Sequence, residues 1–310
     1  MNSQVNEFTV ISPLLQTEGV RFIHRLLLWR YGIPVDFVLN SGQEPEGEMS
    51  ILPLAADLYR LTNLMKAEAY DSEHGQVNYA QLRTSLTYVE YRKCARRLQT
   101  FDPATLSSRE EQLAFWINLY NALVVDAVVQ FEVKQSVTEV PGFFWRAAYA
   151  IGGRRYCAFD IEYGILRANA PHPAIPGLHF GRRDPRRSYS LAQLDPRIHF
   201  ALVCAARSCP PIAVYGAGQI DRQLDMAAQA FINGGGVRLE RTRGEVWLSQ
   251  IFQWYASDFG GRPFGLGDKR PLLKFVARYW SEVLDREALL QGSLAVRFQP
   301  YDWNLNQSLP

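Results

Sequence analysis

Cysteine is scarce in this sequence, and neither sign of charge is in excess. The four cysteines among 310 residues are scattered and include no CxxC pair. This spacing argues against the disulfide framework of small secreted domains. Lys and Arg number 33 against 31 Asp and Glu, a formal charge of +2. The whole chain therefore offers no electrostatic attraction for nucleic acid, and we expect no nucleic-acid partner.

The sequence also shows no secretory signal and no uninterrupted membrane span. The N-terminus MNSQVNEFTV has no basic stretch followed by an apolar one. The longest apolar segment, LAFWINLYNALVVDAVVQF, contains Asn118, Asn121 and Asp126, each costly in hydrocarbon. We expect a cytoplasmic protein with no membrane span, in a reducing compartment that keeps its cysteines as thiols.

Metal ligands do not cluster along the chain. The histidines stand far apart in sequence, at His24, His74, His172, His179 and His199. A compact zinc site normally shows a CxxC pair or closely spaced histidines. We therefore expect no metal and predict no cofactor.

The composition predicts a folded protein, because 47% of the residues are hydrophobic and 13% aromatic. An amphipathic helix is expected in RFIHRLLLWRYG, docked on its own domain rather than on a membrane. The acidic segment SGQEPEGEMS that follows has the character of a linker. We expect an N-terminal helical extension and linker over residues 1–50 and a single domain over 51–310.

Local signals predict an α+β fold. In SSREEQLAFW, Ser107 with Glu110 or Ser108 with Glu111 has the spacing of a capping box, so a helix is expected over 109–131. This helix is apolar on nearly every face and should be central and buried. RIHFALVCA has the pattern of a buried strand, and VRLERTRGEVWLS that of two strands joined by a turn. We expect the central helix and further helices to pack on a small, mostly antiparallel sheet.

Asn118 and Asn121 share one face of the central helix. Their amides need hydrogen-bond partners from elsewhere in the protein. They either hold neighbouring loops in place or form the polar wall of a pocket.

The stretch DPRIHFALVCAARSCPP holds one histidine and two cysteines. In a strand, His199 and Cys204 point to opposite faces, so they form no dyad, and Cys204 is expected in the core. Cys209 lies beyond the strand beside Arg207 and Ser208, and its turn could bring it back toward His199. A thiol with a nearby histidine can act as a nucleophile, although a packed cysteine and a hydrogen-bonded core histidine are the plainer alternative.

Two further groups carry charge near this stretch. In FDIEYGILR, Glu162 could serve as an acid or base or orient His199, or it could simply pair with Arg167 or Arg197. The loop that follows is rich in arginine, with Arg182, Arg183, Arg186 and Arg187. Such a loop could grip an anion or could be a solvated surface.

Seven segments together resemble one known family. In chain order they are VNYAQLRTSL, SSREEQLAFWINLYNAL, GGRRYCAFDIEYGILR, DPRIHFALVCAARSCPP, FINGGG, VWLSQIFQWYASDFG and VRFQPYDWNLN. They resemble the successive motifs of domain of unknown function 547, over about residues 75 to 306. The matching motif positions are Asn118, Tyr120, Asn121, Glu162, Arg167, Asp195, Arg197, His199, Cys204, Ser208, Cys209 and Tyr215.

The resemblance implies a polar site without naming its reaction. Asp126 and Tyr163 stand where family members often have histidine, so a mechanism that needs those histidines is not expected here. A buried helix followed by a segment that opens with histidine also resembles the papain and transglutaminase-like arrangement. Those enzymes carry the nucleophilic cysteine near the start of the helix, where this chain has Phe115 and Trp116.

Two functions fit these residues, and a third, a redox pair of Cys204 and Cys209, fits less well, because CxxxxC lacks the tight spacing of CxxC dithiols. In the first, Cys209 is the nucleophile, His199 its base and Glu162 or Asn118 the orienting group of a hydrolase or acyl transferase acting on an amide or ester. Asn121, Arg167, Arg197 and Ser208 would then contact a small-molecule or peptide ligand. In the second, the protein is a binding or scaffold module that grips an anionic ligand through the arginine-rich loop. The sequence leaves the oligomeric state open.

Overall fold

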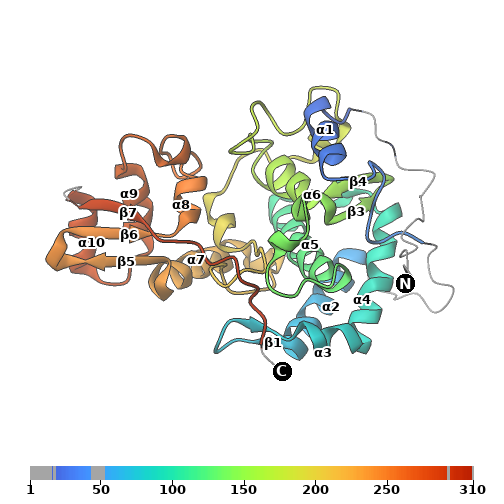
Figure 1. Ribbon diagram of the computed structural model, residues 1–310, viewed down its shortest axis with the longest axis horizontal. Coiled ribbons are helices and arrows are strands. Elements are labelled where there is room, and N and C mark those ends of the chain that lie inside the picture. The colour runs from blue at the N-terminus through green and yellow to red at the C-terminus, as the bar shows by residue number, and fades with distance from the viewer. Residues whose placement is uncertain (1–15, 17–18, 43–52, 292–293, 309–310) are drawn as a thin grey trace, which may run out of the picture.

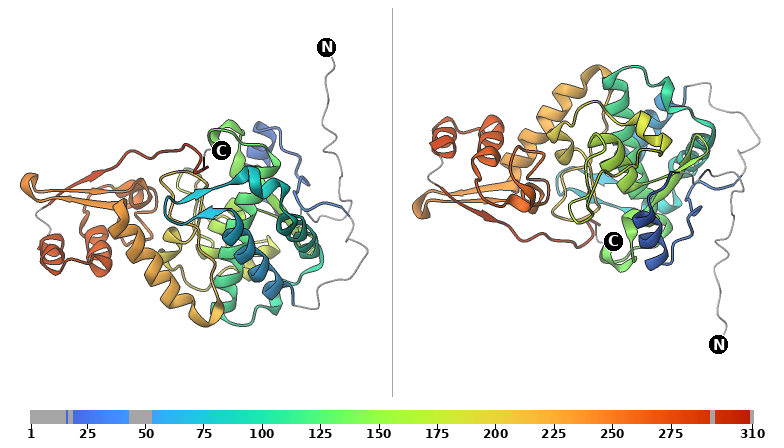
Figure 2. Two further views of the ribbon diagram at one scale, coloured as in Figure 1. Left: turned by 90° about the horizontal axis from the view of Figure 1, so that it is seen from below. Right: turned by 90° about the horizontal axis from the view of Figure 1, so that it is seen from above.

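Two hydrophobic cores divide the chain into a larger and a smaller lobe, which lie side by side in all three views (Figures 1 and 2). The computed structural model describes residues 16, 19–42, 53–291 and 294–308. The larger core gathers residues between 39 and 224, together with Leu305. The smaller core gathers Phe200 with residues from 228 to 289. The expected linker and the domain boundary at residue 50 lie largely outside the described residues.

Helix α5 (Arg109–Gln130) is the centre of the larger lobe, and residues 113–129 of it are all buried. The Ser108 side chain accepts from the backbone of Glu111, and the Glu111 side chain accepts from the backbone of Ser108. The predicted capping box and central helix are therefore confirmed, with Ser108 as the N-cap. By length and composition α5 could cross a membrane, but 94% of its most apolar window is buried inside the protein.

Short helices and two hairpins surround α5. The helices of the larger lobe are α1 (Phe22–Arg30), α2 (Leu54–Ala69), α3 (Tyr79–Thr84), α4 (Leu86–Arg97) and α6 (Phe143–Arg146). Two antiparallel pairs complete the lobe: β1 (Tyr70–Asp71) with β2 (Gln76–Val77), and β3 (Ala148–Ile151) with β4 (Arg154–Cys157). The N-terminal helix α1 packs on its own chain, as expected, because Leu28 joins Trp145 and Cys157 in a small buried cluster.

The smaller lobe holds the mixed sheet and four further helices. Strand β6 (Glu245–Leu248) lies between antiparallel β5 (Val237–Glu240) and parallel β7 (Ala295–Phe298). The helices are α7 (Ile220–Phe231), α8 (Gln250–Trp254), α9 (Arg270–Tyr279) and α10 (Val283–Gln291). Helix α7 joins the lobes, because Leu224 belongs to the larger core and Phe231 to the smaller. The α+β class is confirmed, with three small sheets in place of one.

After β7 the chain returns to the larger lobe, where Figure 1 shows the C-terminus close to α3 and β1. Isolated bridges fix this return segment: Asn304 pairs with Ser136, Leu305 with Ala206, and Gln307 with Val77. The returning chain therefore ties the two lobes together at the site described below.

The strand predicted for RIHFALVCA is wrong. Residues Pro196–Phe200 form a 3₁₀ helix, and the Asp195 side chain caps it by accepting from the backbone of Arg197. Pro196 suits the first turn of such a helix because its missing N–H would be unpaired there in any case. The apolar run reflects burial between the lobes rather than pairing with another strand.

A buried carboxylate links α5 to its neighbours. Asp126 is fully buried and accepts from the Tyr88 hydroxyl at 2.5 Å, the Tyr149 hydroxyl at 2.7 Å and Arg92 at 2.6 Å. These donors come from α4 and β3, so one side chain connects three elements.

Replacing Asp126 with Asn should lower the free energy of unfolding by roughly 3 kcal/mol, because it leaves the largely buried Arg92 without its counter-charge. The matched control is Glu132→Gln, which breaks the exposed pair with Arg83 and should cost under about 1 kcal/mol. Urea unfolding of both variants measures the difference. Equal losses would contradict the role given to Asp126.

Candidate functional site

A cavity of about 350 Å³ lies where the two lobes meet. The larger lobe contributes Tyr120 from α5, Glu162 from the π-helix Asp160–Leu166, and His199 from the 3₁₀ helix. The smaller lobe and the returning chain contribute Tyr255 and Tyr301. The aromatic residues that line it are Tyr120, Phe144, Phe159, Tyr163, Trp254, Tyr255, Phe264, Tyr301 and Trp303.

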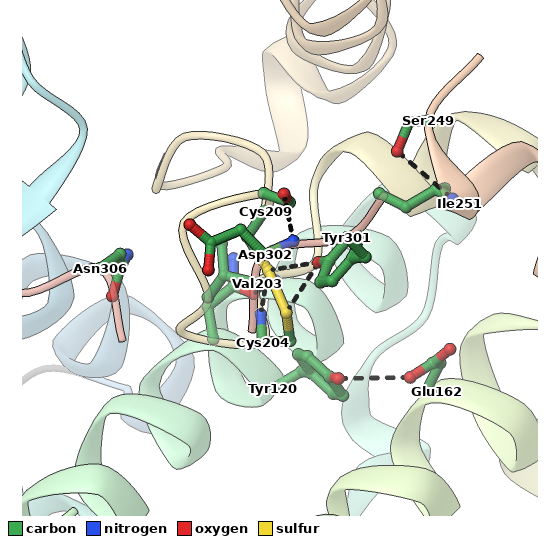
Figure 3. Close-up of a disulfide and its surroundings, with 12 residues drawn as sticks. Tyr120, Glu162, Val203, Cys204, Cys209, Ser249, Ile251, Tyr301, Asp302 and Asn306 are labelled. Atoms are coloured by element: carbon green, nitrogen blue, oxygen red, sulfur yellow. Dashed lines mark hydrogen bonds between the residues drawn. A yellow bond between two sulfur atoms is a disulfide. The ribbon is translucent and has the colours of Figure 1, made fainter. Parts of the chain in front are cut away.

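Cys204 and Cys209 form a disulfide on the wall of this cavity (Figure 3). The expectation that both remain thiols is therefore wrong in this structure, and so is the placement of Cys204 in the core, because its side chain is half-buried and lines the cavity. The argument that a strand directs His199 and Cys204 to opposite faces also fails, because Pro196–Phe200 is a 3₁₀ helix. Cys94 and Cys157 are free and buried.

Two hydrogen-bond donors point at the sulfur of Cys209. The backbone N–H of Cys204 lies 2.9 Å from the Cys209 Sγ, and the Tyr301 hydroxyl lies 3.3 Å from it. The same hydroxyl lies 3.1 Å from the Cys204 Sγ. Burial, and then the nearby Glu162 carboxylate, raise the pKa of Tyr301, so its hydroxyl stays protonated and can donate. Such donors favour negative charge on Cys209 whenever the disulfide is opened.

His199 is held by a carboxylate that the sequence analysis did not select. Its Nε2 lies 2.7 Å from the Oδ2 of Asp258, and its ring stacks on Tyr255 with centroids 3.9 Å apart. Among the described residues, Nδ1 has no hydrogen-bond partner, and the ring lines the cavity. The carboxylate fixes the tautomer with the proton on Nε2, which leaves Nδ1 as a proton acceptor.

Asp258 also receives both nitrogens of one edge of Arg167, at 2.6 and 2.8 Å. Burial by itself would raise the pKa of Asp258, but the hydrogen bonds from His199 and Arg167 outweigh it and hold that pKa at about 2. The carboxylate is therefore ionised wherever the protein is folded at moderate pH. Asp258 is the single acidic residue of the motif VWLSQIFQWYASDFG, which is the signal that could have found it.

Glu162 is 4% exposed and takes hydrogen bonds from two tyrosines instead of an ion pair. The Tyr255 hydroxyl donates to its Oε1 at 2.6 Å and the Tyr120 hydroxyl to its Oε2 at 3.2 Å. Burial, followed by the charge of Glu162, raises the pKa of both tyrosines well above the ordinary value. The expected pairing of Glu162 with Arg167 or Arg197 is not present.

Asn118 and Asn121 support the site from behind. The Asn121 amide accepts from the backbone of Val203 at 3.0 Å and donates to the carbonyl of Ala201 at 2.9 Å. Asn118 makes the same pair of bonds with the backbone of Tyr215 and lines a different cleft, of about 710 Å³, on another side of α5. Each amide therefore pairs with a backbone N–H and a backbone carbonyl, as a neighbouring β-strand would. Neither side chain lines the cavity.

Ser208 also contacts backbone. Its hydroxyl accepts from the N–H of Asp302 at 2.9 Å, and its own N–H donates to the Asp302 carbonyl at 3.3 Å. These bonds fasten the returning chain, and Figure 3 shows its residues Tyr301 and Asp302 beside the disulfide. Ser208 thus places Tyr301, one residue before Asp302, over the sulfurs.

The predicted anion-binding arginines fall into two groups. Arg167, Arg186 and Arg197 are engaged by carboxylates, respectively Asp258, the pair Asp160 and Asp184, and the group Asp195, Asp221 and Asp225. The remaining arginines of the loop, Arg182, Arg183 and Arg187, are exposed. The three engaged guanidinium groups are structural, which leaves the loop with separate surface charges.

One buried group has the residue types of a metal site. Ligand atoms of His24, Asp160 and His179 all lie within 4.8 Å of one another, although His24 and His179 are far apart in sequence. Asp160 already accepts from Arg186 at 2.9 Å. Burial, then the His179 charge and, to a lesser extent, Arg21 and Arg186 lower the pKa of His24 to about 3, although Asp160 opposes them. These cations oppose a further positive charge, so we assign no metal to the group.

The fold and the cavity define an α+β protein that brings a disulfide, an imidazole and a buried carboxylate together within aromatic walls. Residues 103–232 match the family described as protein of unknown function, DUF547, and form a domain of this family. The match is shorter than the expected range of 75 to 306. No curated protein and no solved structure matches the chain. The papain and transglutaminase-like arrangement stays a prediction.

Replacing Asn121 with Ala should cost roughly 2 to 4 kcal/mol of stability, because the buried backbone groups of Ala201 and Val203 lose their partners. The matched control is Asn63→Ala on α2, which removes one exposed hydrogen bond to the Tyr59 carbonyl and should change stability by under about 0.5 kcal/mol. Urea unfolding measures both values. A loss at Asn121 no larger than at Asn63 would contradict the structural role.

Proposed function

We propose that the protein is a thiol-dependent enzyme, a hydrolase or acyl transferase acting on an amide or ester, with Cys209 as its nucleophile after reduction of the disulfide. The observation that carries the proposal is the Asp258–His199 pair, whose imidazole lines the same cavity as Cys209. An oriented imidazole with one free nitrogen is the usual base for a thiol. Asp258 therefore replaces Glu162 and Asn118 as the orienting group.

The chemistry begins with reduction of the disulfide. Two molecules of a small thiol, or one dithiol, supply two electrons and two protons as their sulfurs join in a new disulfide, and this converts Cys204 and Cys209 to thiols. No hydrogen bond joins His199 to Cys209 in the described, oxidised structure, so the freed Cys209 side chain must rotate toward the imidazole. The backbone N–H of Cys204 and the Tyr301 hydroxyl then favour the thiolate.

In the reaction, the Cys209 sulfur attacks the carbonyl carbon of the substrate. His199 accepts the thiol proton and passes it to the departing amine or alcohol, which leaves a thioester on Cys209. Water or a second nucleophile then attacks the thioester, giving its proton back through His199 and releasing the acyl group. After these two steps, acylation and deacylation, Cys209 and His199 are back in their starting states.

A second function, thiol–disulfide exchange, is favoured by the disulfide itself. Both cysteines line the cavity, and the Tyr301 hydroxyl lies near both sulfurs. Cys209 would be the better leaving group because the backbone N–H of Cys204 also donates to its sulfur. The binding module that grips an anion has less support, because Arg186 of the loop is already paired with Asp160 and Asp184, and Arg167 and Arg197 nearby are paired with carboxylates as well.

Iodoacetamide labelling as a function of pH, read by mass spectrometry, tests the proposal. Without reductant Cys209 should not label; after dithiothreitol it should label with an apparent pKa below about 8.5. His199→Ala should raise this pKa, and Asp258→Asn should shift it in the same direction. Cys94 is the internal control, because burial raises the pKa of its thiol to about 12.

Cys204→Ser leaves Cys209 as a thiol without added reductant and should label as the reduced protein does. The reduced protein should also release 4-nitrophenolate from 4-nitrophenyl acetate in a burst of about one equivalent, which Cys209→Ser abolishes. Labelling at an ordinary pKa that His199→Ala leaves unchanged would rule the nucleophile out. Rapid labelling without any acyl transfer would favour thiol–disulfide exchange.

A further inference from the structure

One carboxylate lines the cavity, that of Glu162. Among the described residues of the lining there is no other aspartate or glutamate and no lysine or arginine. Glu162 is 4% exposed and has no lysine or arginine partner in the part of the chain that the structure describes. A buried carboxylate is costly unless charge or strong hydrogen bonds compensate for it, and two tyrosine hydroxyls compensate only in part. The site is therefore short of one positive charge.

The walls around Glu162 suit a cation as well. Rings of Tyr120 and Tyr255 carry the hydroxyls that bind the carboxylate, while Trp254 and Trp303 line the cavity and stack on each other with centroids 5.7 Å apart. The negative face of an aromatic ring attracts ammonium groups, most strongly where water is excluded. Neutral, apolar ligands would gain from these rings too, but they would leave Glu162 uncompensated.

Among the described residues, no lysine or arginine lines the cavity beside Glu162. The guanidinium of Arg167 stands 4.8 Å from the Tyr163 ring centroid and 5.2 Å from that of Tyr255. It is held there by Asp258, whose charge balances it, and it does not line the cavity. The negative charge of Glu162 is also felt by Tyr163 and Tyr301, since it contributes to the raised pKa of each hydroxyl.

From these observations we propose that the cavity recognises a substrate by an alkylammonium group, held by the Glu162 carboxylate and the surrounding aromatic rings. The inference names the substrate class of the proposed enzyme and in that sense rests on the proposed function. The cavity volume of about 350 Å³ suits a small molecule or a single side chain. The substrate class is thus an ester or amide that carries an ammonium group.

The test compares two probes of the same shape, one cationic and one neutral. Choline carries a quaternary ammonium group, and 3,3-dimethylbutan-1-ol replaces its nitrogen with carbon. Ligand-observed NMR titrations use the full chain with the disulfide intact, so that no turnover is needed. Choline should bind at least about tenfold more tightly than the neutral alcohol.

Glu162→Gln should remove most of this preference, whereas Glu132→Gln, on the exposed surface, should retain it. The comparison of the two probes on the unmodified protein stands even if Glu162→Gln fails to fold. Equal affinities, a preference for the alcohol, or no saturable binding of choline would each overturn the inference. Binding of choline without activated labelling of Cys209 would support the ammonium site and contradict the thiol-dependent enzyme. Activated labelling of Cys209 without binding of choline would support the enzyme and contradict the ammonium site.

Discussion

The buried carboxylate of Asp258 is the contact on which the arrangement of the site depends. It lies in the smaller lobe and binds Arg167 and His199, both of which belong to the larger lobe. An ionised group in this position is tolerable only because a guanidinium and an imidazole N–H both point at it. The same three groups therefore fasten the lobes together and set the orientation of the imidazole. A change in the position of either lobe would therefore alter the contact between the lobes and the orientation of the His199 ring together.

The elements that follow from local physics could be predicted from the sequence. Helix α5 and its cap depend on Ser108, Glu111 and a continuous apolar run, all of which are neighbours in the chain. The 3₁₀ helix Pro196–Phe200 was mistaken for a strand because a short apolar run fits either structure. The structure has a 3₁₀ helix capped by Asp195, and the backbone that follows it is bound on either side of Leu202 by the Asn121 amide, about eighty residues away.

The candidate site could be predicted only in part, for a related reason. His199, Cys209 and Glu162 were selected because their side chains can carry chemistry, and they do line one cavity. Their partners could not be chosen in the same way. Asp258 and Tyr301 become relevant only when the smaller lobe and the returning chain close over the larger lobe, and no periodicity records that contact. The disulfide was missed because the scattered cysteines and the expected reducing compartment both argued for thiols.

The carboxylate and the disulfide are connected through Tyr301. Its hydroxyl lies within hydrogen-bond distance of both sulfurs, and the negative charge of Glu162 contributes to its raised pKa. An ammonium group beside Glu162 would cancel much of that negative potential. Tyr301 would then donate more strongly, and a thiolate on Cys209 would be repelled less. Recognition of a cationic substrate and activation of the nucleophile would therefore favour each other, because both depend on the one uncompensated charge in the cavity.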